Sequence, residues 1–295
     1  MNPAPKDRAR VLVDVDWLAA HLDDPSLVLL EVDDQPAMYH RGHPPGAHTV
    51  SWQQELQDTI RRDIPTSQAM AELWRRVGIR QESTVVFYGD LNNWLAAYGY
   101  WLFTLYGLPN VRLLDGGRQR WVTRHLPMNL EAPPPPAHTG QTPPPTLQAQ
   151  SRAGRPAVAH AARHGCLLDV RSPEEYIGQW LTEPEFPGEA AHRPGHIPGA
   201  VSVPWDLAFD TNGCIKPTKE LRHLYTTAGA HPHVPVVTYC RIGERSAHTW
   251  IILHDLLAYP DVSNYDGSWT EWGSMNGMPI QLGPKPGALP SEFTA

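Results

Sequence analysis

Residues 236–250 read VVTYCRIGERSAHTW, and this stretch contains most of the information about the fold. The VVTY run is apolar on both alternating faces, as expected of a strand that helices cover on both sides. A short loop with one glycine follows, and a helix is predicted to begin near Ser246. The strand therefore delivers Cys240 to its carboxyl end, the edge of a parallel sheet at which ligands bind.

The two halves of the chain repeat one plan. Three markers recur in the same order: GHPPGA at 42–47 and GHIPGA at 195–200, VVFY at 85–88 and VVTY at 236–239, and LDGG at 114–117 and YDGS at 265–268. The offset is 153 positions for the first pair and 151 for the other two. An earlier pair, LLEV at 29–32 and LLDV at 167–170, is 138 apart, so the second copy carries extra residues, which we place within 173–194. This regularity indicates a duplicated domain.

A proline-rich segment separates the copies. Seven of the 31 prolines lie within residues 131–146. Such a segment favours extended polyproline II structure and cannot continue a helix or a central strand. We therefore predict a first domain at 9–130, a linker at 131–151 and a second domain at 152–290.

Short apolar runs alternate with helical stretches in each copy, which predicts an α/β fold with a mostly parallel sheet and helices on both faces. In the second copy the expected strands are 166–170, 200–203, 234–239 and 262–265, and the expected helices include 219–228 and 246–259.

Composition excludes several classes of partner. The net charge is −7 and the isoelectric point is near 6.1, which argues against nucleic acid and anionic membranes. No run approaches the length of an uncharged membrane span, and residues 1–10 lack the apolar core of a signal peptide. Three cysteines without a CxxC pair do not predict a disulfide scaffold. We expect a cytoplasmic monomer.

No metal or cofactor is expected. His160 and His164 are one helical turn apart, and His231 and His233 flank a proline, but neither pair has a third ligand at a recognisable spacing. The glycine-rich spots lack a nucleotide-loop pattern.

The chemistry is expected at Cys240. The loop after it contains Arg241 and Arg245, and the amino end of the following helix adds partial positive charge. Such surroundings lower the pKa of a thiol and favour the thiolate. Cys166 and Cys214 have no comparable neighbours and are expected to be inert.

The loop from Cys240 to Ser246 resembles the active-site loop of rhodaneses, the thiosulfate sulfurtransferases. The two G-H-x-P-G-A motifs and the YDGS turn resemble turns of the same domains, and the likeness covers nearly the whole chain. It is closest to the bacterial tandem type, in which only the second copy is catalytic. The first copy agrees, because Gly89 stands at the position of Cys240 and Asp90 at that of Arg241. We expect the first copy to wall one side of the active cleft.

The resemblance implies a mechanism and a set of site residues. The Cys240 thiolate would attack the outer sulfur of thiosulfate, sulfite would leave, and the persulfide would pass its sulfur to cyanide or a thiol. The residues expected to bind the substrate are Arg241, Ile242, Gly243, Glu244, Arg245 and Ser246, with Arg193 as a further source of positive charge.

Three alternatives remain. Enzymes for 3-mercaptopyruvate typically carry a small uncharged residue after the cysteine, whereas Arg241 favours the thiosulfate dianion. However, the lysine that animal rhodaneses place two residues after the cysteine is Ile242 here, and one of their arginines falls on Glu175.

The second alternative is a phosphatase of related fold. Such an enzyme needs five residues between its cysteine and its arginine, and here four residues separate Cys240 from Arg245. The third alternative is a non-enzymatic interaction module. Such a module has no need of the cysteine loop, so the presence of the whole loop in the second copy argues against it.

The roles of two further residues stay open. His43 matches a histidine proposed to face the active site in mercaptopyruvate enzymes, but His196 occupies the same turn in the other copy, which favours a shared role in the turn. Asp169 ends a strand and is expected to fix the surrounding loops.

Overall fold

The computed structural model describes residues 7–33, 36–134, 141–184 and 189–294, in two compact units. The N-terminal unit comprises Asp7–Ala149 and the short segment Asp210–Ile215, and the C-terminal unit comprises Gln150–Phe209 and Lys216–Ala295. The segment Asp210–Ile215 groups with the N-terminal unit, and its Ile215 N–H donates to Asp115 Oδ1 at 2.8 Å.

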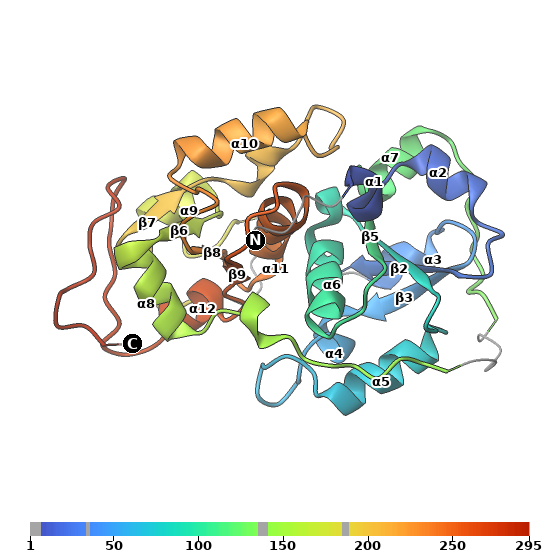
Figure 1. Cartoon of the computed structure of the whole chain (residues 1–295), viewed down its shortest axis with the longest axis horizontal. Coiled ribbons are helices and arrows are strands. Elements are labelled where there is room, and N and C mark those ends of the chain that lie inside the picture. Colours follow the sequence, from blue (N-terminus) through green and yellow to red (C-terminus); the bar gives the residue numbers. More distant parts are fainter. Residues whose placement is uncertain (1–6, 34–35, 135–140, 185–188, 295) are drawn as a thin grey trace. The chain divides into compact units, whose positions relative to one another are not determined.

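The N-terminal unit is built on a five-stranded parallel sheet with the strand order β1-β5-β4-β2-β3 (Figure 1). Its strands are β1 (Leu12–Val13), β2 (Leu27–Asp33), β3 (Ala47–Ser51), β4 (Thr84–Tyr88) and β5 (Val111–Leu114). Its helices are α1 (Arg8–Val11), α2 (Val15–Ala20), α3 (Pro36–His40), α4 (Trp52–Glu55), α5 (Ser67–Arg76), η1 (Leu91–Asn93), α6 (Trp94–Leu105) and α7 (Gly117–Thr123).

Alternation along β4 explains why helices cover both faces of this sheet. Val86 and Tyr88 belong to a buried cluster that includes side chains of α2, α3 and α7. Phe87 points to the opposite face, where it packs edge-on against Phe103 of α6 with ring centroids 4.8 Å apart. Eleven of the twelve residues of α6 are buried, so this helix has almost no polar face.

The C-terminal unit contains a four-stranded parallel sheet with the order β7-β6-β8-β9. Its strands are β6 (Cys166–Asp169), β7 (Ala200–Ser202), β8 (Val236–Tyr239) and β9 (Val262–Asn264). Its helices are α8 (Arg155–His164), α9 (Pro173–Ile177), η3 (Trp205–Ala208), α10 (Thr218–Thr227), α11 (Glu244–Trp250), η4 (Ile251–Leu256) and α12 (Ser268–Trp272), and η2 (Ala149–Ser151) precedes α8.

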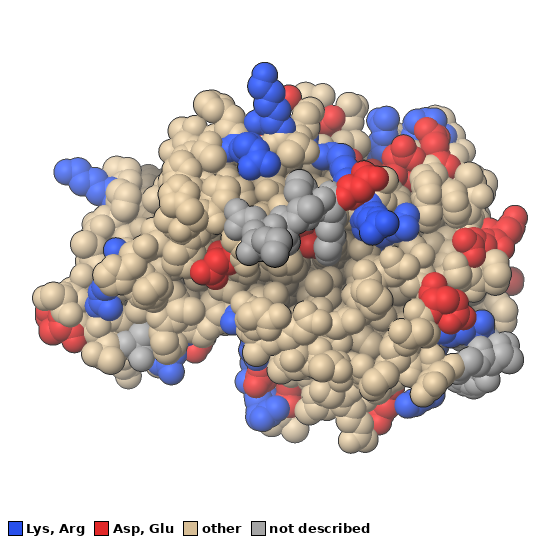
Figure 2. Space-filling model, viewed as in Figure 1, with Lys and Arg blue, Asp and Glu red and all other residues tan. Residues whose placement is uncertain are grey.

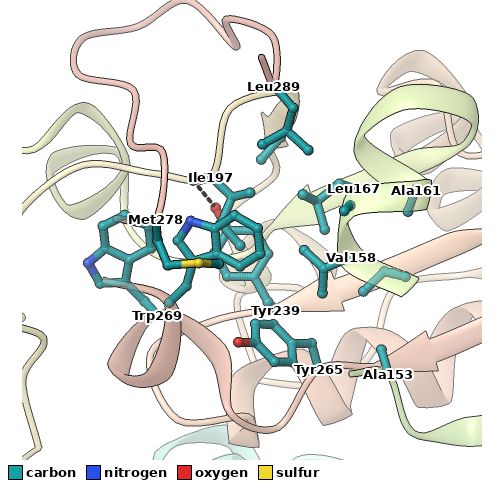
Figure 3. Close-up of a cluster of buried hydrophobic side chains, with 14 of the residues drawn as sticks. Ala153, Val158, Ala161, Leu167, Ile197, Tyr239, Tyr265, Trp269, Met278 and Leu289 are labelled. Carbon is teal, nitrogen blue, oxygen red and sulfur yellow. Dashed lines mark hydrogen bonds between the residues drawn. The ribbon is translucent and has the colours of Figure 1, made fainter. Parts of the chain in front are cut away.

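The same alternation operates along β8. Val237 and Tyr239 join Val158 of α8 and Trp269 of α12 in one buried cluster (Figure 3). In Figure 3 the Tyr239 hydroxyl accepts a hydrogen bond from Ile197 N at 3.2 Å. Thr238 points to the other face and donates to Ser246 O of α11 at 3.1 Å. The strand that carries Cys240 is therefore fixed from both sides.

The predicted α/β fold with mostly parallel sheets is confirmed, and the four expected strands of the second copy are present with slightly shorter bounds. The expected helix 246–259 begins earlier, at Glu244, and continues from Ile251 to Leu256 as a π-helix. The segment predicted as a linker is described only in part, since residues 135–140 lie outside the described residues. Within its described part, Gln148 N–H donates to Leu105 O at 2.7 Å.

Charged side chains of both signs are interspersed on the face shown in Figure 2. Among the residues that the structure describes, no helix has the length and apolar character required to cross a bilayer. Within the same residues, no three His, Cys, Asp or Glu side chains form a group that could hold a metal ion.

Candidate active site

The loop between β8 and α11 places Cys240 directly after the last residue of the strand. The loop can turn into the helix because Gly243 adopts the left-handed conformation with φ of 99°. A Cβ atom at this position would lie 2.6 Å from Asp266 Cα and 2.9 Å from Asp266 O. Only glycine therefore fits between the loop and the turn that follows β9.

The Cys240 sulfur lies in a polar, fully enclosed position. Its side chain has no exposed surface, and Gly243 N–H donates to Sγ at 3.1 Å. Glu244 Oε2 lies 3.3 Å from Sγ, so the thiol donates to this carboxylate. The Cys240 N–H donates to Ser268 Oγ at 3.1 Å, which fixes the start of the loop. The Gly243 amide and Ser246 thus face the sulfur as hydrogen-bond donors, and Glu244 faces it as an acid.

The thiolate expected from the sequence does not follow from this geometry. Burial raises the pKa of the Cys240 thiol, the Glu244 carboxylate raises it further, and Arg245 and Ser246 oppose the shift without reversing it. The two loop arginines are visible in the sequence, but the carboxylates that neutralise Arg245 lie elsewhere in the chain. These surroundings therefore favour the thiol over the thiolate.

Arg245 is completely buried, and its guanidinium is committed to two carboxylates. It donates to both oxygens of Glu175, at 2.8 and 3.1 Å, and to Glu183 Oε1 at 2.8 Å. Burial alone would raise the pKa of Glu175, but Arg245 overcomes this effect and holds the pKa at about 2. Glu175, at the position where related enzymes were expected to carry an arginine, is thus the counter-ion of the loop arginine.

The other loop residues mainly shape the site. Arg241 is 6% exposed and donates to the Thr182 hydroxyl, and Ile242 is buried. Ser246 Oγ donates to Asn264 Oδ1 at 2.7 Å, while Asn264 Nδ2 donates to Gly243 O at 2.9 Å. Asn264 of β9 therefore ties the loop to the first turn of α11.

Arg193 does not reach the loop, contrary to the expectation that it supplies charge there. Its guanidinium donates to four backbone carbonyls at and beyond the end of α12, those of Trp272, Gly273, Met275 and Met278. The Trp272 and Gly273 carbonyls lie at the carboxyl end of the helix, so Arg193 caps α12 and ties it to the segment that follows.

Several residues that surround the loop were not predicted from the sequence. Thr182 and Glu183 lie in the extra segment of the second copy, part of which, residues 185–188, is outside the described residues. Their positions could not be read from any motif. Ser268 lies in the repeated YDGS turn, and Asn264 lies directly before it. The repeat of this turn in both copies was the sequence feature that could have pointed to these two residues.

His43 and His196 make the same contacts in the two copies, as a shared role in the turn requires. His43 Nδ1 lies 3.0 Å from Tyr39 O and its ring stacks on Tyr39 at 3.8 Å. His196 Nδ1 lies 2.7 Å from Tyr176 O and its ring stacks on Tyr176 at 3.7 Å. Both histidines are fully buried. Each one anchors its turn to the helix before it.

Asp169 lies behind the loop and forms part of a buried network. It accepts three hydrogen bonds from Arg171 Nε and Nη2, the shortest at 2.5 Å, and one from the Tyr239 hydroxyl at 2.6 Å. Arg171 also donates to Gly195 O and lies over the Trp269 ring, 4.7 Å from its centroid. Asp169 therefore fixes the G-H-x-P-G-A turn, in agreement with a role in positioning loops.

The remaining cysteines differ from Cys240 in their surroundings. All three cysteines are free. Burial raises the pKa of Cys166 to about 12, and burial with the charges of Asp115 and Asp210 raises that of Cys214 to about 11. A raised pKa is thus common to the three thiols, and only Cys240 combines a strand end, a glycine turn and an adjacent carboxylate.

Comparison with known proteins identifies the family. The rhodanese-like domain family matches residues 14–124 and 148–275. A "Sulfur carrier protein TtuD" of Thermus thermophilus is 45% identical over 278 residues, which cover 92% of this chain and 97% of that protein. A "Putative thiosulfate sulfurtransferase" of Mycolicibacterium smegmatis is 45% identical over 94% of this chain and 99% of its own length.

Solved structures agree on the fold. The anaerobic ergothioneine biosynthesis enzyme from Chlorobium limicola superimposes with a TM-score of 0.82 at 20% identity, over 94% of this chain and 71% of that one. YnjE superimposes with a TM-score of 0.78 at 23% identity, over 93% of this chain and 68% of its own. With two matching domains and full-length relatives at 45% identity, the chain belongs to the rhodanese family of sulfurtransferases.

Proposed function

We propose that this protein transfers sulfane sulfur from thiosulfate to a thiol or cyanide acceptor through a persulfide on Cys240. The observation that carries the proposal is the position of Cys240 at the carboxyl end of β8, with Gly243 N–H donating to its sulfur at 3.1 Å. Ligands of parallel α/β sheets bind at this edge, and the amide can stabilise negative charge that develops on sulfur.

The proposed reaction has two displacements. In the first, the Cys240 sulfur loses its proton and attacks the outer sulfur of thiosulfate, whose sulfur–sulfur bond breaks so that sulfite leaves with the electron pair. In the second, the acceptor attacks the outer sulfur of the persulfide and the electron pair returns to Cys240. Splitting one transfer into two steps predicts ping-pong kinetics.

Thiosulfate is proposed as the donor because of the cation directly after the nucleophile. Arg241 is nearly buried and lies at the loop, so a dianion gains more from this site than the singly charged 3-mercaptopyruvate does. The arginine fork also matches the oxygens of a sulfonate group. The donor preference is therefore proposed to depend on Arg241 and not on Arg245, which is committed to Glu175 and Glu183.

A second candidate function is that of a sulfur carrier, since a relative at 45% identity bears that name. Carrier and transferase share the persulfide and differ only in the acceptor, which would be a protein for the carrier and a small thiol or cyanide for the transferase.

The test is an assay of sulfite and thiocyanate release from thiosulfate and cyanide by the purified protein and by Cys240→Ser. We expect turnover by the wild type only, and after thiosulfate alone a gain of about 32 mass units on the peptide that contains Cys240. Faster turnover of 3-mercaptopyruvate would reassign the donor. Hydrolysis of a phenyl phosphate without sulfite release would contradict the proposal altogether. A stable persulfide that small acceptors do not discharge would favour the carrier.

A further inference from the structure

Glu244 is the acid closest to the nucleophile, and the displacements described above assign it no role. Its side chain is completely buried at the first position of α11, and Oε2 lies 3.3 Å from Cys240 Sγ. Its other oxygen, Oε1, is also buried and accepts no hydrogen bond from the part of the chain that the structure describes. A buried carboxylate with one oxygen unsatisfied is costly, so this arrangement requires a reason.

We propose that Glu244 is the base that takes the proton from the Cys240 thiol and returns it when the transferred sulfur leaves. This inference rests on the proposed function, since it concerns the first step of the same reaction. It gives a chemical role to a residue that the sequence suggested only as part of a substrate-binding loop.

The distribution of charge around the sulfur favours a proton acceptor over a preformed thiolate. Arg245 faces Glu175 and Glu183, and Arg241 donates to Thr182. Arg245 is thus neutralised by carboxylates and Arg241 is turned to Thr182, whereas Glu244 faces the sulfur directly. A thiolate at Cys240 and a carboxylate at Glu244 would lie 3.3 Å apart, and two negative charges at this distance repel each other strongly in a buried site. An ionised Cys240 therefore becomes favourable once Glu244 has taken up the proton.

The proton balance of the reaction fits this pair. In the first step the S–H bond breaks, the proton moves to Glu244 Oε2, and the sulfur electron pair forms the bond to the outer sulfur of thiosulfate while sulfite leaves. The products in the site are a persulfide anion and a neutral carboxylic acid. In the second step the acceptor removes the outer sulfur, the electron pair returns to Sγ, and the proton returns from Glu244. The buried pair thus carries one negative charge before and after each step, and no oxidant or reductant is needed.

The first copy provides an independent observation. Asn93 stands at the position of Glu244, at the offset of 151 that relates the two strands and loops. Its Oδ1 accepts from Gly89 N–H at 3.0 Å, and its Nδ2 donates to Leu114 O at 2.6 Å. Where the loop has no cysteine, this position holds an amide with both ends bonded. Where the loop has a cysteine, the same position holds a carboxylate, one oxygen of which accepts no hydrogen bond from the described residues.

Glu244→Gln is the decisive variant, because it keeps the shape of the side chain and removes the base. General base catalysis contributes about 10²- to 10⁴-fold, so we expect persulfide formation at pH 7 to slow by about 100-fold or more. The rate of the variant should rise with pH toward that of the wild type, whereas the wild-type rate should be flat through neutrality. A merely electrostatic effect predicts the opposite sign, since removing a negative neighbour lowers the thiol pKa and speeds attack. An unchanged or faster rate in Glu244→Gln would overturn the proposal.

Glu244→Asp separates proton transfer from packing. It keeps the carboxylate and should keep the flat pH profile even where its rate is lower. A profile as steep as that of the glutamine variant would assign Glu244 a packing role and contradict the proposal. Circular dichroism and the thermal unfolding midpoint should confirm that each variant is folded before its rates are compared.

A second readout does not depend on the sulfur donor. Alkylation of Cys240 by iodoacetamide, followed by mass spectrometry of its peptide so that Cys166 and Cys214 do not contribute, requires the same loss of the thiol proton. We expect Glu244→Gln to slow this reaction at pH 7, and equal alkylation rates would again contradict the proposal. If the wild type alkylates faster than the variant but forms no persulfide from thiosulfate, the proposed donor fails while the proton acceptor stands.

Discussion

The carboxyl ends of β4 and β8 occupy the same place in two copies of one sheet and present opposite chemistry. At the end of β8, Cys240 lies between an amide hydrogen and a carboxylate. At the end of β4, Gly89 is closely packed, and a Cβ atom there would lie 2.5 Å from Val32 O and 3.0 Å from Asp33 Oδ1. The first copy therefore lacks both a cysteine at this position and the space for one.

The networks behind these two ends are built from different arginines. In the C-terminal unit, Asp169 is held by Tyr239 and by Arg171, which also donates to Gly195 O. In the N-terminal unit, Glu31 accepts from Tyr88 and from Arg118, which donates to Gly42 O. At the repeat offsets of 138 and 151, Arg171 corresponds to Asp33 and Arg118 to Trp269.

The difference shows what the duplicated fold requires and what it leaves free. Each copy needs a buried cation between a carboxylate in the carboxyl-terminal half of a strand and the carbonyl of the G-H-x-P-G-A turn, because both oxygens are buried and need a donor. Either neighbouring loop can supply that cation. The cysteine, in contrast, depends on one position of one loop.

The largest effect is expected from moving the nucleophile between the copies. Cys240→Ser should reduce sulfur transfer to background, because serine does not form a persulfide. Adding Gly89→Cys to this variant should not restore transfer, because the new side chain has no space and Asp90 stands where the active copy has Arg241. Thiocyanate formation and the mass of the Gly89→Cys peptide after thiosulfate would check this. Measurable transfer by the double variant would show that the first copy retains a working site.

The next effect concerns the buried ion pair of the second copy, whose arginine corresponds to the buried Trp94 in the first copy. Arg245→Met should destabilise the C-terminal unit by about 3–5 kcal/mol, because it leaves the buried Glu175 without its cation. The double variant Arg245→Met with Glu175→Met should recover most of this loss. Urea unfolding followed by circular dichroism measures both. Equal losses for the single and double variants would contradict the assignment of Glu175 as the counter-ion.

A smaller effect is expected from Asp33, which stands in the first copy at the position of Arg171. Burial raises the pKa of Asp33 from 3.8 to about 8, although the Asp90 amide opposes this shift. As pH rises from about 4 to 8 the unfolded chain loses this proton and the folded chain keeps it, so wild-type stability should fall through that window. Asp33→Asn should remove this fall, a difference on the order of 3 kcal/mol after screening by water. A difference between the two unfolding midpoints that does not change with pH would contradict this interpretation.

The smallest effect is expected from filling the closed loop of the first copy. Gly89→Ala should destabilise the N-terminal unit by about 1–3 kcal/mol, because the added methyl group meets a backbone oxygen that cannot move far. Gly154→Ala is the matched control, since an added Cβ there would meet only Pro156 Cδ, at 3.7 Å. The unfolding midpoints of the two variants should differ, and equal midpoints would mean that the loop after β4 has room for a side chain.

The sequence by itself determined the duplicated α/β fold and the position of Cys240 at the carboxyl end of a buried strand. Both follow from local patterns: apolar runs of strand length, turn motifs at constant offsets, and a cysteine directly after a buried strand. These patterns hold because a residue's place on a strand or in a turn depends mainly on its immediate neighbours along the chain.

Only the tertiary structure decided the electrostatics of the site. The sequence showed two arginines near Cys240, but it could not show that Glu175 and Glu183 neutralise Arg245 or that Arg193 caps α12. Nor could it show that Glu244 would face the sulfur. The physical reason is that the charge felt by a buried group depends on distances of a few ångströms between segments far apart in the chain, and no local pattern determines those distances.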